Sequence, residues 1–463
     1  MPLFIYNSLT RKKEEFIPLH PPKINIYTCG VTVYDESHIG HARSLYIFDV
    51  VRRYLRYRGF EVKFVRNITD IDDKIINRAR QLKTGWQELV KKYIDRYYED
   101  LAALGIQKGD FEPRATENIP DMIEYIAALI DKGFAYATPS GVYFSVRKFQ
   151  GYGKLSGQSI DQMQSGSRIE PDETKEDPLD FALWKRSNPD EPSWDSPWGA
   201  GRPGWHIECS VMSQKFLKTD TLDIHAGGRD LIFPHHENEI AQAEALTGKP
   251  FARFWIHHGL LTINGQKMSK SLGNFVTVKD FIAKFKNADL LKILFLSAHY
   301  SHPVDYTDEK MEEARRALER IMILSDKIRT PDKAPGTGKE IKEIEDIKSR
   351  FIAAMDDDFN TPQALACVFD LVNAANKNIQ DPGFTLRAGE TLKELAGMLG
   401  IALKMEEKTT GLSHEDIEAR IKDREEARRR KEFALSDKIR KELEEKGVIL
   451  EDTKEGTSWR RKL

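Results

Sequence analysis

The chain of 463 residues carries 71 Lys and Arg against 73 Asp and Glu, a formal net charge of −2. Charged residues make up 31% of the chain and hydrophobic residues 40%, which excludes a disordered chain and a uniformly basic nucleic-acid coat. At about 150 residues per domain, the length predicts two to four domains.

The sequence has no apolar run near the ~18 residues of a membrane-spanning helix. The residues after Met1 lack the apolar stretch and the cleavage site of a secretory signal. The three cysteines, Cys29, Cys209 and Cys367, are too few for a disulfide framework and favour a reducing compartment. Cys367 lies in an apolar helical pattern and is predicted to be packed. We therefore expect a cytoplasmic protein without membrane contact.

Alternating apolar residues predict a first strand over 23–28, and an apolar period near 3.6 predicts a helix over about 38–57. A second strand over 61–65 leads into another helix. This alternation predicts an α/β fold with a parallel sheet and helices on its faces. Dense glycines and prolines over 140–200 predict a loop-rich insertion with short strands such as Val142–Val146. The pattern is helical from about Phe281 onward.

Residues 38–41 read His-Ile-Gly-His at the head of the first predicted helix. Unpaired backbone N–H groups and the helix dipole favour an anion there, and His38 and His41 lie on one side of the first turn. Gly40 lets a flat base or sugar approach the backbone. Taken alone, the tetrapeptide more often marks a polar helix start with two solvated histidines.

Residues 267–271 read Lys-Met-Ser-Lys-Ser between glycine-containing turns, which predicts a mobile loop. Two lysines and two hydroxyls can clamp phosphates and suit a diphosphate leaving group. The alternative is a solvated basic turn. Both motifs together are much rarer by chance, and the pair resembles the HIGH and KMSKS signatures of the class I aminoacyl-tRNA synthetases. The resemblance implies a Rossmann-type catalytic domain. It also implies ATP binding by His38, Gly40, His41 and Lys270, and catalytic roles for His38, His41, Lys267 and Lys270.

Cys29, Cys209, His235 and Glu239 are of the residue types that bind zinc. His235 and Glu239 are i and i+4, which places them on one face of a predicted helix in which Pro234 suits the first turn. The spacing is weak support, because Cys29 and Cys209 lie far apart in the sequence. Two packed free cysteines are the alternative.

Four segments resemble the cysteinyl-tRNA synthetase family: Cys29–Gly30, Asn67–Lys74, Gly204–Ser210 and Phe233–Glu239. The resemblance runs from about Ile24 to Leu463. It implies one Zn²⁺ per chain on Cys29, Cys209, His235 and Glu239, with His236 and Glu237 pointing elsewhere. The implied reaction joins L-cysteine to the 3′ end of tRNA(Cys) through cysteinyl-adenylate, with ATP and Mg²⁺ as substrate. A thiol on zinc separates cysteine from serine without an editing domain.

The same resemblance implies substrate-binding roles for Gly30, Thr69, Trp205 and His225, although Trp205 fits a core aromatic equally well. Asp70 is a further candidate, for the α-amino group. Ala226 stands where the family usually has glycine.

Trp459, Arg460 and Arg461 place an aromatic ring inside a basic cluster near the C-terminus. Aromatic rings stack on splayed bases and cations hold phosphates, and the tail resembles the family's anticodon-reading domain, so these three residues are expected to bind tRNA. The basic run 428–431 is offset by neighbouring acidic residues, and a solvated face is its default interpretation.

The predicted organisation has six parts: a Rossmann-type catalytic domain in two halves (1–125 and 201–260), an inserted connective subdomain (126–200), a KMSKS-bearing segment (261–315), a helical bundle (316–403) and an anticodon-binding tail (404–463). A monomer is expected. Two alternatives remain open. One is a ligase that passes cysteine from the adenylate to an amine acceptor, which would lack the C-terminal tail. The other is a non-catalytic RNA-binding or zinc-binding relative, against which the two intact motifs argue.

Overall fold

A four-stranded parallel sheet in the order β10-β9-β3-β4 forms the centre of the molecule. The computed structural model describes residues 2–160, 162–163, 174–269, 272–329, 341–403, 414–453 and 456–461. The central strands are β3 (Lys23–Thr32), β4 (Glu61–Thr69), β9 (Leu222–Gly228) and β10 (Ala252–His258). Their parallel pairing confirms the predicted α/β class.

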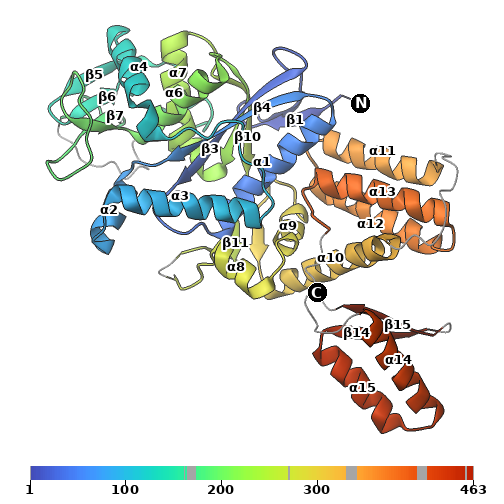
Figure 1. Ribbon diagram of the computed structural model, residues 1–463. Helices are drawn as coiled ribbons and strands as arrows, with labels where there is room; N and C mark the ends of the chain where they lie inside the picture. The colour runs from blue at the N-terminus through green and yellow to red at the C-terminus, as the bar shows by residue number, and fades with distance from the viewer. Residues whose placement is uncertain are drawn as a thin grey trace.

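Helices cover both faces of this sheet (Figure 1). They are α1 (Ile39–Tyr57), α3 (Trp86–Ala103), α6 (Trp205–Leu217) and α7 (Glu237–Thr247), whereas α2 (Asp73–Leu82) packs beside α3. Successive strand residues point to opposite faces. Ile26 therefore packs in the core beneath α1, whereas Tyr27 packs in the core beneath α6 and α7.

The segment between α3 and α6 contains a second sheet, which is antiparallel, and the short strand predicted over 142–146 lies in it. This sheet has the order β5-β6-β7-β8. Its strands are β5 (Ala135–Thr138), β6 (Gly141–Phe144), β7 (Phe181–Arg186) and β8 (Gly201–Pro203), and helix α4 (Ile119–Asp131) packs with them. They share their own apolar core, which includes the buried Trp184.

A small three-stranded sheet and two short helices follow β10. They are β11 (Leu261–Ile263), β12 (Gln266–Lys267), β13 (Val304–Tyr306), α8 (Val278–Phe285) and α9 (Asp289–Leu296). An N-terminal hairpin of β1 (Phe4–Asn7) and β2 (Lys12–Glu15) packs near the edge strand β10.

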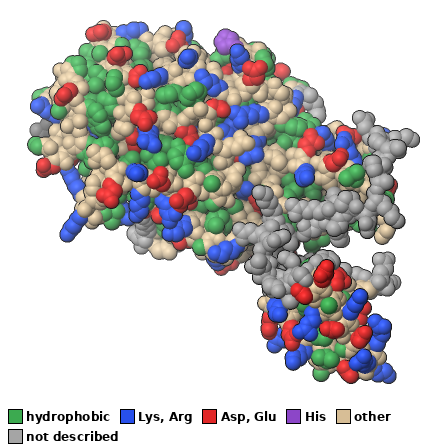
Figure 2. All heavy atoms as spheres, in the orientation of Figure 1, with side chains coloured by type: hydrophobic (Ala, Val, Ile, Leu, Met, Phe, Trp, Pro, Cys, Tyr) green, Lys and Arg blue, Asp and Glu red, His purple; other side chains and the backbone are tan. Residues whose placement is uncertain are grey.

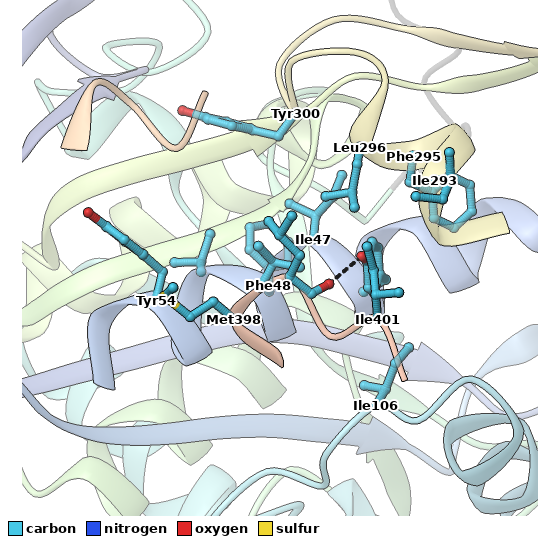
Figure 3. Packing of buried hydrophobic residues seen from close by; sticks show 14 of the residues in the cluster. Ile47, Phe48, Tyr54, Ile106, Ile293, Phe295, Leu296, Tyr300, Met398 and Ile401 are labelled. Atoms are coloured by element: carbon cyan, nitrogen blue, oxygen red, sulfur yellow. Dashed lines mark hydrogen bonds between the residues drawn. The ribbon is translucent and has the colours of Figure 1, made fainter. Parts of the chain in front are cut away.

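A helical bundle packs against α1. Its helices are α10 (Asp308–Arg329), α11 (Lys342–Asp356), α12 (Thr361–Lys377) and α13 (Pro382–Met398). Figure 3 shows the apolar packing here, with Ile47 and Phe48 of α1 near Leu296 of α9 and Ile401 beyond α13. The Tyr46 hydroxyl donates to the Leu399 carbonyl at 2.5 Å. The helix that carries the HIGH motif is therefore bonded to the bundle.

The C-terminal unit stands apart from the rest of the chain in Figure 1. It consists of α14 (His414–Arg429), α15 (Phe433–Glu445), β14 (Val448–Thr453) and β15 (Gly456–Arg461). Its small apolar core is separate from the others. Figure 2 shows acidic and basic side chains intermixed on the visible face of this unit.

Within the described part of the chain, none of the helices is long and apolar enough to cross a membrane. The six-part division expected from the sequence stays a prediction.

Candidate active site and metal centre

Four predicted metal ligands from distant segments converge beside the carboxyl ends of the central strands. One ligand atom from each of Cys29, Cys209, His235 and Glu239 lies within 4.8 Å of all the others. Cys29 Sγ lies 3.7 Å from Cys209 Sγ, Cys209 Sγ lies 3.5 Å from His235 Nε2, and His235 Nε2 lies 3.0 Å from Glu239 Oε1. Two sulfurs, one imidazole and one carboxylate form a donor set that suits Zn²⁺.

Each of these ligands is placed by a different local feature. Cys29 lies in β3 where the register with β4 shifts. Cys209 is in the second turn of α6 and Glu239 in the first turn of α7. His235 precedes α7, and its ring stacks on Trp205 with centroids 4.0 Å apart.

The charges of the cluster are strongly coupled because the site is buried. Burial would raise the pKa of Glu239, but His225 and His235 hold it well below its usual range. For His235 the effect of burial is the opposite and would lower the pKa, but the neighbouring Glu239 and Cys209 raise that pKa to about 10. Burial opposes ionisation of Cys209, whereas the hydrogen bond from Cys29 and the contact with His235 lower its pKa to about 6. Burial and the neighbouring Cys209 and Glu239 raise the pKa of Cys29 well above its usual range. Metal ligands are deprotonated, so a divalent cation bound here would displace the protons of Cys29 and His235.

The expectation that His236 points away from the cluster is wrong. His236 Nε2 lies 3.2 Å from Cys29 Sγ, and His236 Nδ1 lies 2.8 Å from His257 Nε2. His236 has helical angles and lies three residues before Glu239, and side chains at i and i+3 share a helix face, so both His235 and His236 turn toward Glu239. Glu237 does point elsewhere, since its carboxylate accepts hydrogen bonds from three backbone N–H groups of residues 153–156. His236 therefore joins a second compact set of potential ligands with Cys29, His225 and Glu239.

The four predicted substrate-binding residues surround this cluster. Trp205 covers His235 as described, and His225 Nε2 lies 2.6 Å from Glu239 Oε2. The Thr69 hydroxyl donates to Glu208 Oε2 at 2.6 Å. The Gly30 backbone N–H donates to Asn67 Oδ1 at 2.8 Å.

Two further residues that the sequence singled out are Asp70 and Ala226. The Asp70 carboxylate accepts hydrogen bonds from the Thr116 backbone and hydroxyl, at 2.9 and 2.6 Å, and its contact with an α-amino group stays a prediction. Ala226 is fully buried within β9.

The HIGH motif forms a capped helix start. His38 Nδ1 accepts hydrogen bonds from the backbone N–H groups of Gly40 and His41, at 3.1 and 3.3 Å. A neutral His38 ring therefore carries its proton on Nε2. The His38 and His41 rings stack with centroids 3.7 Å apart. Burial, His38 and Lys74 lower the pKa of His41 to about 3, so that its ring is neutral at physiological pH.

The KMSKS segment lies next to this helix start. Ile39 N donates to Val276 O at 3.1 Å, and Val278 N donates to Ser37 O at 2.9 Å. These bonds tie the chain after the loop to the chain before α1. Lys267 ends β12 and is exposed, while Lys270 lies outside the described residues.

The C-terminal aromatic residue is more embedded than the sequence predicted. Trp459 packs against the small core of its unit, and its indole N–H donates to Glu418 Oε1 at 2.7 Å. The side chains of Arg460 and Arg461 lie outside the described part of the structure. Phe433 at the start of α15, which the sequence analysis did not single out, is 63% exposed. The sequence feature that could have pointed to Phe433 as a candidate for RNA contact is its position close to the basic run 428–431.

Comparisons with known proteins define the class of this fold and site. Residues 15–316 match the family model for the tRNA synthetases class I (C) catalytic domain, residues 350–404 match the DALR domain, and residues 411–460 match the cysteinyl-tRNA ligase anticodon binding domain. The chain belongs to the class I aminoacyl-tRNA synthetases.

Curated relatives identify the member of that class. The chain is 51% identical to the cysteine–tRNA ligase of Geobacillus thermodenitrificans, over 99% of this chain and 98% of the relative. It is 49% identical to that of Persephonella marina and 48% identical to that of Aquifex aeolicus, each over 99% or more of both chains. The chain therefore belongs to the cysteine–tRNA ligase family, and it is an aminoacyl-tRNA ligase.

Solved structures with the same fold are more distant. Mycobacterium tuberculosis methionyl-tRNA synthetase in complex with methionyl-adenylate is 16% identical, with a TM-score of 0.59 over 82% of this chain and 90% of that one. Agrobacterium radiobacter K84 LeuRS, in a ternary complex with tRNA and LeuAMS, is 12% identical, with a TM-score of 0.60 over 84% and 86%. At these identities the likeness concerns the fold alone.

Proposed function

We propose that this chain activates L-cysteine with ATP and Mg²⁺ to give cysteinyl-adenylate and pyrophosphate, and then transfers the cysteinyl group to the 3′ end of tRNA(Cys). One Zn²⁺ on Cys29, Cys209, His235 and Glu239 selects the cysteine thiol. The observation that carries this proposal is the convergence of those four side chains within 4.8 Å, beside the strand ends that position the substrate.

The protein's own residues shape the amino-acid pocket. Trp205 stacks on His235 and orients its imidazole, while His225 holds the Glu239 carboxylate. When bound, Zn²⁺ supplies a soft Lewis acid that favours a thiolate over the hydroxyl of serine. A directed bond of this kind discriminates far better than the ~1–3 kcal/mol available from packing around one extra or missing group.

The chemical step is electrostatic and depends on positioning. The N–H groups of Ile39, Gly40 and His41 already have partners within the protein. The dipole of α1 still favours negative charge at its start, and the proton on His38 Nε2 supplies a donor from the same turn. Stacking against His38 holds the neutral ring of His41 beside it. Lys267 and Lys270 neutralise the charge on the departing pyrophosphate, with the role of Lys270 drawn from the motif.

The C-terminal unit binds the anticodon region of tRNA. Trp459, Arg460 and Arg461 are the residues predicted for this contact. Phe433 is the stronger candidate for base stacking, because most of its ring is exposed, whereas Trp459 packs against its own unit. We also propose that the protein acts as a cytoplasmic monomer.

The test is transfer of labelled cysteine to tRNA by the zinc-replete protein with ATP, with serine as the control amino acid. We expect cysteine alone to be transferred, and Lys270→Ala to depress cysteine-dependent ATP–pyrophosphate exchange. Exchange driven by cysteine without charging of tRNA would instead favour the ligase that uses an amine acceptor. Unchanged exchange in Lys270→Ala would refute the role of that lysine.

A further inference from the structure

The strand that carries Cys29 is interrupted where the candidate metal cluster begins. In the β3–β4 ladder, Thr28 pairs with Arg66 and Val31 pairs with Ile68. Two residues of β3, Cys29 and Gly30, therefore oppose the single residue Asn67 of β4. Such a bulge re-aims a side chain and leaves backbone groups without ladder partners.

The Asn67 side chain supplies the missing partner. Its Oδ1 accepts the hydrogen bond from the Gly30 backbone N–H at 2.8 Å. A backbone N–H can only donate, so this bond also decides which end of the amide faces the bulge. Only glycine fits at residue 30, because an added Cβ would lie 1.5 Å from the backbone carbonyl oxygen of Asn67. Cys29 is thus held in place through its neighbour.

The other end of the same amide bonds Thr69, which is one of the predicted substrate-binding residues. With Oδ1 on Gly30, Nδ2 donates to the Thr69 hydroxyl at 3.3 Å. That hydroxyl in turn donates a hydrogen bond to Glu208 Oε2 at 2.6 Å. Cys209 Sγ also contacts Asn67 Oδ1 at 3.8 Å. Asn67, Thr69 and Glu208 are each at most 2% exposed, so the Asn67–Thr69 and Thr69–Glu208 bonds are buried.

We propose that Asn67 is a positioning residue for the cysteine pocket, and that its side-chain amide aligns Cys29 through the Gly30 bulge and Thr69 through its hydroxyl. This inference rests on the proposed function. It differs from a purely structural role because the two ends of the amide serve different parts of the site. Loss of the amide should therefore change metal affinity and cysteine binding together and leave ATP binding alone.

The test measures zinc affinity by competition with a chromogenic chelator, without substrates, and then KM for cysteine and for ATP in pyrophosphate exchange. We expect Asn67→Ala to weaken zinc binding by about 10- to 100-fold and to raise the cysteine KM by about tenfold. The ATP KM should stay within about twofold of the parent value, since the Asn67 amide does not reach the HIGH helix.

Asn118→Ala is the matched control, since Asn118 is also a buried asparagine, 2% exposed, with both ends of its amide bonded. Equal losses in this control, or parent-like zinc affinity and cysteine KM in Asn67→Ala, would overturn the proposal.

Thr69→Val keeps the shape of residue 69 and provides the second test should Asn67→Ala fail to fold. It should raise the cysteine KM while leaving zinc affinity near the parent value, and an unchanged cysteine KM would overturn the proposed alignment of Thr69. The zinc measurement also separates this inference from the proposed function. A parent protein that binds zinc but shows no cysteine-dependent exchange would contradict the function, while a loss of zinc in Asn67→Ala would still support the role of Asn67.

Discussion

Asp100 of α3 is a buried carboxyl group that should make stability depend on pH. Its side chain packs beneath the start of the HIGH segment, where Ser37 donates a hydrogen bond to it. Asp100 is 8% exposed, and its Oδ2 has no hydrogen-bond partner in the described structure. Burial and the neighbouring carboxylate Glu36 raise the pKa of Asp100 to about 7, whereas Arg96 opposes the shift and Glu99 adds to it.

The sign of the effect follows from proton linkage. The unfolded chain, with an Asp pKa of about 3.9, releases this proton at lower pH than the folded protein. Stability is therefore lost as pH rises from about 4 to about 7 and is constant above that range. A folded-state pKa of about 7 differs from the unfolded value by about 3 units, which costs at most about 4 kcal/mol at pH 8 and about 1.5 kcal/mol at pH 5.

Asp100→Asn removes this titration and should stabilise the catalytic body, more at pH 8 than at pH 5. The difference of about 2.5 kcal/mol corresponds to about 5 °C in the melting midpoint of a large domain. Differential scanning calorimetry of the parent and the variant from pH 5 to pH 8 measures it. Asp95→Asn is the matched control, because Asp95 is an exposed residue of the same helix. An equal shift at both pH values, or lower stability of Asp100→Asn at pH 8, would refute the reasoning.

Three further predictions follow from the metal cluster and the C-terminal unit. Cys209→Ser replaces a soft ligand by a hard one and should lower bound zinc, measured by metal analysis, at least about tenfold; parent-like zinc content would contradict this. Phe433→Ala should raise the tRNA KM in charging about tenfold, since stacking on a base contributes ~1–3 kcal/mol. Pyrophosphate exchange should stay unchanged in this variant, and Leu435→Ala serves as the control. Arg424→Gln removes a bidentate ion pair with Asp452 and should lower the free energy of unfolding of the C-terminal unit by about 2 kcal/mol. This is less than for a fully buried pair, because the Asp452 side chain is 33% exposed. Arg424 holds the pKa of Asp452 well below its usual range, so the cost, measured by thermal melting, should be present at neutral pH and lost as the pH falls through that lowered value.

The regular elements could be predicted because they depend on local patterns. The apolar period of residues 38–57 predicted α1, which spans Ile39–Tyr57, and alternating residues predicted β3 and β4. The insertion was harder, because strands β5–β8 are short and lie among glycines and prolines. Their identity depends on pairing with one another rather than on local propensity.

The candidate ligands were predicted from motifs, and the fold brings them together from segments far apart in the chain. The error at His236 has a physical cause, since only the i,i+4 spacing of His235 and Glu239 was considered, whereas the i,i+3 spacing of His236 and Glu239 also places two side chains on one helix face. Phe433 was missed because exposure is a tertiary property. An aromatic residue beside a basic run can equally be a buried anchor.

The amino-acid sequence by itself determined the α/β class, the two phosphate-binding motifs and the residue types of the candidate metal set, because each depends on local patterning or on recognisable segments. Only the tertiary structure decided that His236 faces the cluster and that Asn67 opposes a two-residue bulge. Both depend on how separate strands and helices pack, and a shift of one residue in register changes them while the residues themselves stay the same.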